Sequence, residues 1–166
     1  MKLNILLALC LGFTISCGGT AKKAETKTTP DTTVNVAATA DEGLALNADS
    51  DSGKAGALQT VYFDYNSASL RGDAKTVLKA NAEFLKANKS VEVQVEGHCD
   101  ERGSVQYNIA LGEKRAKAVK EYLTALGIAG KRLSTISFGK ERPVGFGHDE
   151  AAWDKNRRGN FVVTAK

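Results

Sequence analysis

The chain of 166 residues has only three cysteines, and it has no apolar run long enough to cross a membrane. A membrane-spanning helix needs about 20 apolar residues, whereas the longest apolar stretch, residues 3–15, is shorter. Three scattered cysteines are too few for the disulfide framework of a small secreted domain. The sequence also lacks internal repeats and the closely spaced ligand pairs of zinc modules, so we expect no metal and no cofactor.

The beginning of the chain has the pattern of a bacterial export signal: a positive start, an apolar stretch and small residues around Cys17. Residues 14–17 resemble a lipobox, although Thr14 stands where Leu is usual, and Gly18 resembles the sorting pattern for the outer membrane. We therefore expect a lipoprotein signal peptide at residues 1–16. Acyl chains on Cys17 would anchor the protein in the outer membrane with its domain facing the periplasm. A short uncleaved membrane anchor is the alternative.

Residues 18–57 differ in composition from the rest of the chain. They are rich in Ala, Thr, Asp, Lys and Gly, and they contain no aromatic residue and few large apolar ones. Such a segment cannot bury a core. Together with Cys17 it predicts a lipidated, disordered tether over residues 17–57. A loosely packed extension of the domain is the alternative for residues 43–47 only.

Hydrophobic periodicity predicts one folded domain at residues 58–166. Alternating apolar and polar residues indicate strands, and apolar residues every three or four positions indicate helices. The expected strands are 61–65, 91–95, 133–138 and 160–164, and the expected helices are 70–85, 105–126 and a short one at 150–156. The order β-α-β-α-β-(α)-β with half-buried strands predicts an α+β fold. We expect a two-layer α/β sandwich with helices on one face of a mixed sheet and the other face partly solvated.

The predicted domain is moderately basic. From residue 58 onward it has 18 Lys and Arg against 13 Asp and Glu, a net charge of +5. Nucleic acid is the usual partner of a basic domain, but here acids alternate with the basic residues along the helices, and the chain carries an export signal. A solvated surface with a mild attraction to anionic envelope polymers fits better.

The densest polar run, residues 96–103, lies where a predicted strand ends and a loop leads into a helix. Functional groups concentrate on loops that rigid elements hold in place. One face of the following helix carries a stripe of six residues, of which the last three are expected in the core: Asn108, Leu111, Arg115, Val119, Tyr122 and Leu126. The stripe therefore brings an arginine to a buried face close to Asp100.

Because an unpaired buried charge is unfavourable, Arg115 needs a partner. One interpretation is an internal ion pair between Asp100 and Arg115 that fixes the loop. The other is a clamp in which Asp100 accepts hydrogen bonds from a ligand ammonium and Arg115 grips a ligand carboxylate, aided by backbone N–H groups at the helix start. A zwitterionic amino-acid centre carries both groups on one carbon. In the empty clamp the two residues would neutralise one another.

Several motifs in order carry a family resemblance that covers residues 61–163. They are YFD (62–64), VEGHCDERG (95–103), YNIALGEKRA (107–116), SFGKE (137–141), GHDEAA (147–152) and NRR (156–158). They resemble the OmpA-like peptidoglycan-binding domains, and within them the lipidated branch, the peptidoglycan-associated lipoproteins. Cys99 is a departure, because the family usually has Thr or Ala there. Cys99 is either a small buried hydrophobe or, if exposed, an oxidisable thiol.

The resemblance implies non-covalent binding of peptidoglycan through the diaminopimelate of its stem peptides. The binding residues that it implies are Asp100, Arg115, Asn108 and Leu111, with His98, Phe63 and Asp64 at the border of the site. It further implies a tether between outer membrane and cell wall, and a periplasmic partner of the TolB type in a Tol–Pal system for envelope integrity and cell division. The alternative is a protein–protein interaction module with little wall binding.

The residues disfavour an enzyme. A Cys–His hydrolase needs a thiolate beside a histidine, but His98 and Cys99 are neighbours on a strand and point to opposite faces. A metal site from His98, Asp100 and His148 lacks paired ligand spacing. Asp149 is better explained as a helix cap. For residues 156–158 we expect a structural role, with one arginine paired to loop acids and the other exposed.

Overall fold

The computed structural model describes residues 44–166, so the predicted signal peptide and the lipidated cysteine lie outside the described residues. The described elements, in chain order, are β1 (Val61–Tyr62), α1 (Gly72–Ala87), β2 (Glu92–His98), α2 (Val105–Ala125), a short 3-10 turn (Gly130–Arg132), β3 (Leu133–Gly139), α3 (Glu150–Asn156) and β4 (Arg158–Ala165). The predicted order and type of the elements are confirmed. No helix in this part of the chain is both long enough and apolar enough to span a bilayer.

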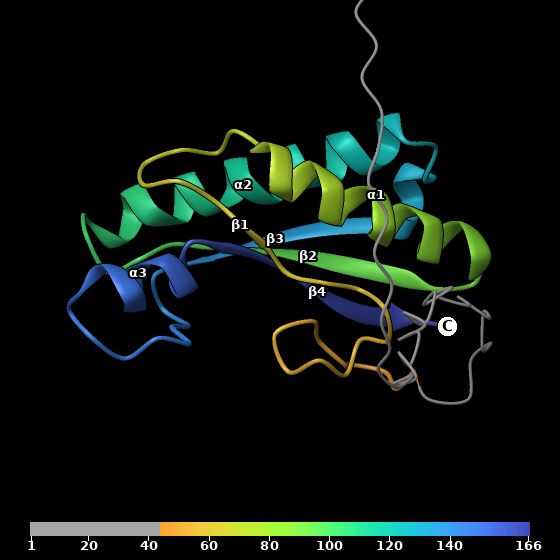
Figure 1. Cartoon of the computed structure of the whole chain (residues 1–166), viewed down its shortest axis with the longest axis horizontal. Coiled ribbons are helices and arrows are strands. Elements are labelled where there is room, and N and C mark those ends of the chain that lie inside the picture. Colours follow the sequence, from red (N-terminus) through yellow and green to blue (C-terminus); the bar gives the residue numbers. More distant parts are fainter. Residues whose placement is uncertain (1–43) are drawn as a thin grey trace, which may run out of the picture. The chain divides into compact units, whose positions relative to one another are not determined.

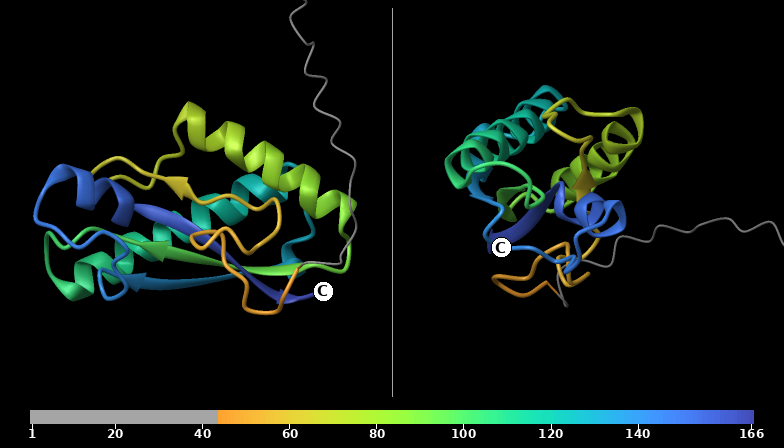
Figure 2. Two further views of the ribbon diagram at one scale, coloured as in Figure 1. Left: turned by 60° about the horizontal axis from the view of Figure 1, so that its bottom comes forward. Right: turned by 90° about the vertical axis from the view of Figure 1, so that its left-hand side faces the viewer.

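The four strands form one mixed sheet in the order β1-β4-β2-β3. β2 and β3 are parallel, whereas β4 pairs antiparallel with both β1 and β2. α1 and α2 lie side by side on one face of this sheet (Figure 1), and the end-on view of Figure 2 shows both helices in one layer above it. The predicted two-layer α+β architecture is therefore confirmed.

Alternate residues of the strands point toward the helices and form the core. On β2 and β4 these are Val93, Val95, Phe161 and Val163, each 1% exposed or less. The residues between them face the other way and are largely polar. This alternation is what a strand with one apolar face produces.

The predicted tether is wrong for residues 44–57. This segment continues the sheet edge beyond β1: the amides of Asn47 and Ser50 donate to the carbonyls of Val163 and Phe161 at 2.8 and 2.9 Å. Leu44 and Ala55 are buried in the core. Composition misled the prediction because these small polar residues are held by backbone pairing with β4, which needs no large side chains.

At its N-terminal end α2 lies directly against β2 because two glycines meet there. A Cβ on Gly97 would lie 1.8 Å from the carbonyl oxygen of Gly112, and a Cβ on Gly112 would lie 2.3 Å from Ser137 Oγ. Only residues without side chains allow this approach. The contact brings the start of α2 to the end of β2, where the polar run begins.

The buried stripe of α2 is rotated slightly from the predicted one. Val119 is fully buried as expected, but Leu123 is the deepest residue of the last turns. Tyr122 and Leu126, predicted in the core, are only partly buried and pack against its margin. The shift arises because α1 as well as the sheet covers α2, so the buried face points between the two.

Candidate functional site

The loop between β2 and α2 is fixed by its own hydrogen bonds. Ser104 caps α2, its Oγ accepting from the amide of Tyr107 at 3.2 Å. Gly103 has φ +94, a conformation that side chains disfavour. The side-chain amide of Asn108 donates to the carbonyls of Arg102 and Ser104 at 2.9 and 3.1 Å. The loop therefore reaches the start of α2 in one defined shape.

Asp100 lies at the base of this loop and is only 4% exposed. Its Oδ1 accepts from the backbone N and the Nε of Arg102 at 3.1 and 3.2 Å, and its Oδ2 accepts from Arg102 Nη2 at 2.7 Å and from Arg157 Nη1 at 3.4 Å. Burial alone raises the pKa of Asp100, but the hydrogen bonds from Arg102 outweigh it and lower that pKa. The carboxylate is therefore ionised at neutral pH.

Arg115 is 1% exposed and is held by three backbone carbonyls. Its Nε donates to Ser67 at 2.8 Å, Nη1 to His98 at 2.7 Å, and Nη2 to Asp64 at 2.9 Å. A guanidinium has five N–H donors, so two remain, one on each Nη. The Phe63 ring supports the group, with its centroid 5.1 Å from Cζ.

The internal Asp100–Arg115 ion pair does not exist in the described chain. Asp100 forms ion pairs with Arg102 and Arg157 instead, and the expected mutual neutralisation in the empty site is wrong. The reason is local. Arg102 is only two residues from Asp100 and donates to it from both side chain and backbone. Arg115 instead donates to the backbone carbonyl groups described above.

Asp100 and Arg115 nevertheless line the same pocket, which has a volume of about 270 Å³. Four predicted residues line it: Asp100, Asn108, Leu111 and Arg115. The residues that the sequence did not assign to it are Tyr65, Asn66, Cys99, Arg102, Gly103 and Tyr107. A signal for the first two existed, because they directly follow the YFD motif that borders the site.

The other three predicted residues support Arg115 instead of lining the pocket. Phe63 lies beneath its guanidinium, while Asp64 and His98 supply carbonyl oxygens to it. The carboxylate of Asp64 pairs with Arg71 at 3.1 Å. The His98 ring points to the other sheet face, where its Nε2 lies 3.3 Å from Glu96 Oε2. The Phe63 ring and the carbonyl groups of Asp64 and His98 thus orient Arg115.

Cys99 is a buried thiol, 3% exposed, whose Sγ lies 3.4 Å from the carbonyl oxygen of Asn108. Burial raises its pKa. The interpretation as a small buried residue is confirmed, and its side chain is turned away from His98, as strand geometry predicts. Across residues 44–166 no group of three His, Cys, Asp or Glu side chains is arranged to hold a metal ion.

Both arginines of the NRR motif are buried, at 3% exposure each, so the prediction that one is exposed is wrong. Arg157 pairs with Glu150 at 2.6 Å and with Asp154, in addition to Asp100. Arg158 pairs with Asp51 of the N-terminal segment at 2.6 Å. Asp51 was not predicted as the partner of Arg158, because the segment that carries Asp51 was predicted to be a tether.

The predicted cap of α3 is confirmed. Asp149 Oδ1 accepts from the amide of Ala152 at 2.9 Å. The loop before α3 also contacts the pocket loop, since His148 Nδ1 lies 2.8 Å from the carboxylate of Glu101, which also accepts from Trp153 Nε1 at 2.9 Å. The segment 148–153 therefore braces the loop that carries Asp100.

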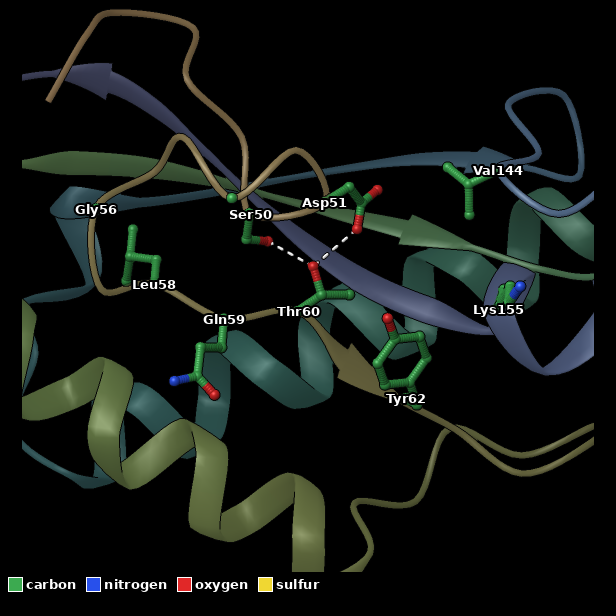
Figure 3. A pocket seen from close by; sticks show the side chains of 10 residues that line it. Ser50, Asp51, Gly56, Leu58, Gln59, Thr60, Tyr62, Val144 and Lys155 are labelled. Atoms are coloured by element: carbon green, nitrogen blue, oxygen red, sulfur yellow. Dashed lines mark hydrogen bonds between the residues drawn. The ribbon is translucent and has the colours of Figure 1, made fainter.

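A larger cavity of about 520 Å³ lies beside the N-terminal segment (Figure 3). The polar side chains at its centre bind each other: Thr60 Oγ1 donates to Asp51 Oδ1 at 2.7 Å and lies 2.7 Å from Ser50 Oγ. These groups hold the segment against the sheet. The smaller pocket is the one with convergent, oppositely charged groups and is the better candidate site.

Comparisons with known proteins show the family of the chain. The OmpA family matches residues 62–157. A peptidoglycan-associated lipoprotein of Pseudomonas aeruginosa is 38% identical over 161 residues, which are 95% of each chain. The chain belongs to the OmpA family and, within it, to the peptidoglycan-associated lipoproteins. The member from Pasteurella multocida is 50% identical over 99 residues, which are 60% of this chain and 66% of that one.

Solved structures show the same fold. The crystal structure of the peptidoglycan-associated lipoprotein from Burkholderia pseudomallei has a TM-score of 0.61 and 42% identity, covering 63% of this chain and 89% of that one. The C-terminal domain of Helicobacter pylori MotB has the same TM-score at 21% identity, over 65% of this chain and 85% of that one. The second likeness concerns the fold alone.

Proposed function

We propose that this protein is an outer-membrane lipoprotein that binds peptidoglycan non-covalently through the diaminopimelate of its stem peptides. One observation carries the proposal: a buried carboxylate and a buried guanidinium line one pocket of about 270 Å³. The free end of diaminopimelate carries an ammonium and a carboxylate on one carbon. Asp100 accepts from the ammonium, and the two remaining N–H donors of Arg115 bind the carboxylate.

The neighbouring residues complete the proposed clamp. Leu111 gives the pocket an apolar wall for the methylene chain of the ligand, and Asn108 holds the loop by its bonds to two carbonyls. α2 begins at the pocket, so the positive end of its dipole favours a carboxylate there. The ligand is bound and released unchanged, since no activated nucleophile lies in the pocket: the Cys99 thiol has a raised pKa and faces away from His98.

The proposed anchor completes the tether. Lipidation at Cys17 holds the chain in the outer membrane, and the domain that begins no later than residue 44 grips the wall. Relatives named peptidoglycan-associated lipoproteins support this arrangement. We place the protein in a Tol–Pal system, where such a link serves envelope integrity and cell division. Replacing Cys17 by Ser should abolish labelling with palmitate; labelling that persists would contradict the anchor.

A second candidate function, docking of a TolB-type periplasmic protein, is favoured by an exposed apolar loop beside the pocket. Phe146 is 88% exposed and Val144 45% exposed. Exposed aromatic residues frequently anchor protein interfaces. The substitution Phe146→Ser should weaken capture of such a partner and leave sedimentation with cell-wall sacculi unchanged. Equal capture by both forms would remove this loop from the interface.

The test of the proposed clamp uses two arginines with the same structural task. Arg115 and Arg132 each donate to three backbone carbonyl groups, but only Arg115 lines the pocket. Arg115→Lys and Asp100→Asn should lose co-sedimentation of the full chain with sacculi. The matched control Arg132→Lys should keep it. If Arg115→Lys sediments like the wild type while folded by circular dichroism, the clamp is wrong.

A further inference from the structure

The carboxylate of Asp100 has no acceptor site left for a ligand. A carboxylate offers about four acceptor positions, and four donors occupy them: three from Arg102 and one from Arg157. An ammonium that approaches Asp100 therefore meets two guanidinium groups and no free lone pair. Binding of a zwitterion to Asp100 therefore requires one of these donors to leave.

The side chain of Arg102 is the donor that is free to leave. The Arg157 side chain is 4% exposed and is also bonded to Glu150, Asp154 and the carbonyl of Phe63. The Arg102 side chain is 28% exposed and supplies two of the four bonds. Its backbone amide remains on Asp100 Oδ1 when the guanidinium moves, so the loop keeps its shape.

The residues around Arg102 allow its guanidinium to move away from Asp100 and offer it a second carboxylate. It lies between two aromatic rings, with Cζ 3.9 Å from the centroid of Tyr65 and 4.0 Å from that of Trp153. A planar cation between two flat rings can slide in its own plane and keep both contacts. Glu150 Oε2 already lies 3.8 Å from Arg102 Nη1. The move therefore keeps the cation stacked and paired.

We infer that Arg102 is an internal occupant of the ammonium side of the pocket, and that ligand binding transfers its guanidinium from Asp100 to Glu150. The inference rests on the proposed function. It makes Arg102 a specificity-determining residue: the site opens only for a ligand whose ammonium replaces the guanidinium on Asp100. A ligand that carries a carboxylate but no ammonium leaves Arg102 on Asp100 and binds to Arg115 alone.

The chain contains its own reporter of this movement. Trp153, the only tryptophan of the sequence, stacks on the guanidinium that moves. The experiment titrates the full chain with the tripeptide L-alanyl-D-glutamyl-meso-diaminopimelate, followed by calorimetry and by Trp153 fluorescence. In the wild type the fluorescence change should saturate together with the heat. The same tripeptide acetylated only on the amine at the free end of diaminopimelate, with the alanyl amine left free, should bind more weakly and leave the fluorescence unchanged.

Variants separate release of Arg102 from a general loosening of the loop. Arg102→Gln should bind the free tripeptide at least threefold more tightly and lose the fluorescence change, with no gain for the acetylated one. Glu150→Gln should weaken binding at least twofold in the wild type and have no effect in the Arg102→Gln background. The control Lys117→Gln, which removes an exposed positive charge that does not line the pocket, should change neither measurement.

Each failure has a distinct meaning. Weaker binding by Arg102→Gln would make Arg102 a ligand contact and overturn the inference. Wild-type binding without any change in Trp153 fluorescence would also overturn it, even if Arg102→Gln failed to fold. A wild type that does not bind the tripeptide, or an Asp100→Asn variant that binds equally well, would instead refute the proposed function.

Discussion

Arg115 and Arg132 hold opposite ends of β2. Arg115 ties the carbonyl at the end of β2 to the loop that follows β1, whereas Arg132 ties the residue before β2 to the C-terminal end of α1. Arg132 makes four such bonds, with Nη2 donating to both Asn88 and Val91 at 2.6 Å. Arg115 makes three and lies beside a pocket.

In the proposed clamp, this difference is what makes one of two structural arginines a binding residue. Both arginines satisfy carbonyl groups that the ends of strands and helices leave without partners. At the Arg132 end the donors are nearly used up. At the Arg115 end two donors remain, and a buried carboxylate lies across the pocket. The surplus of hydrogen-bond donors, together with burial, distinguishes the proposed binding end of the sheet.

The largest expected effect separates the two arginines. Arg115→Ala removes a charged donor from three carbonyl groups in a fully buried position, so unfolding should become easier by about 3 kcal/mol or more. Arg132→Ala, whose side chain is partly exposed, should cost about 1 to 2 kcal/mol because water can replace it. Urea denaturation of the two variants tests this order. Equal losses would mean that burial does not distinguish the two ends.

The second effect concerns the glycines at the two ends. Gly112→Ala places a Cβ against Ser137 and the carbonyl of Gly97 and should cost about 2 kcal/mol. It should also weaken sacculus binding, because the start of α2 moves away from β2. Gly130→Ala at the Arg132 end meets nothing within 4 Å and should change stability by less than about 0.5 kcal/mol. A harmless Gly112→Ala would contradict the close contact.

A smaller effect is expected for Cys99 at the proposed binding end. Its thiol is buried and bonded weakly to one carbonyl, so Cys99→Ala should cost about 1 kcal/mol. Sacculus binding should stay unchanged. The native thiol should react with maleimide far more slowly than the unfolded one, because burial raises its pKa. Rapid labelling of the native chain would contradict the burial of the thiol.

The smallest effect appears only in acid. The folded pKa of Asp100 is lowered, so its contribution to stability is complete above the ordinary pKa of an aspartate, about 3.9, and is lost as the pH falls through the lowered value. Acid unfolding of the wild type should therefore lose this contribution, and Asp100→Asn should lack that part of the pH dependence. Identical acid limbs for the two proteins would show that Asp100 is not stabilised by its arginines.

Much of the fold could be predicted from local patterns. The strand periodicity of residues 91–95 and the helix periodicity of residues 105–126 reappear in β2 and α2 nearly unchanged. The domain start could not be predicted, because residues 44–57 are held by pairing with β4 and by contacts such as Asp51–Arg158. Such contacts join residues more than 100 positions apart, and no local pattern records them.

The sequence predicted several residues of the candidate site but not the ion pairs that they form. Helical spacing from Arg115 and the position of Asp100 after a strand place both residues at one end of the sheet, and they do line one pocket. The sequence suggested that they pair with each other. Instead, Arg102 lies on Asp100 between two aromatic rings, one of which comes from α3. That partner choice depends on distances between loops.

The amino-acid order by itself determined the elements, the apolar face of each strand and the residue types at the end of β2. These follow from backbone periodicity and from where polar residues interrupt it. Only the tertiary structure decided which charges meet. Ion pairs form between side chains that packing brings within about 4 Å, and the two touching glycines, the braced loop and the N-terminal segment set those distances. Tertiary packing therefore gave Arg115 spare donors and gave Asp100 an internal partner.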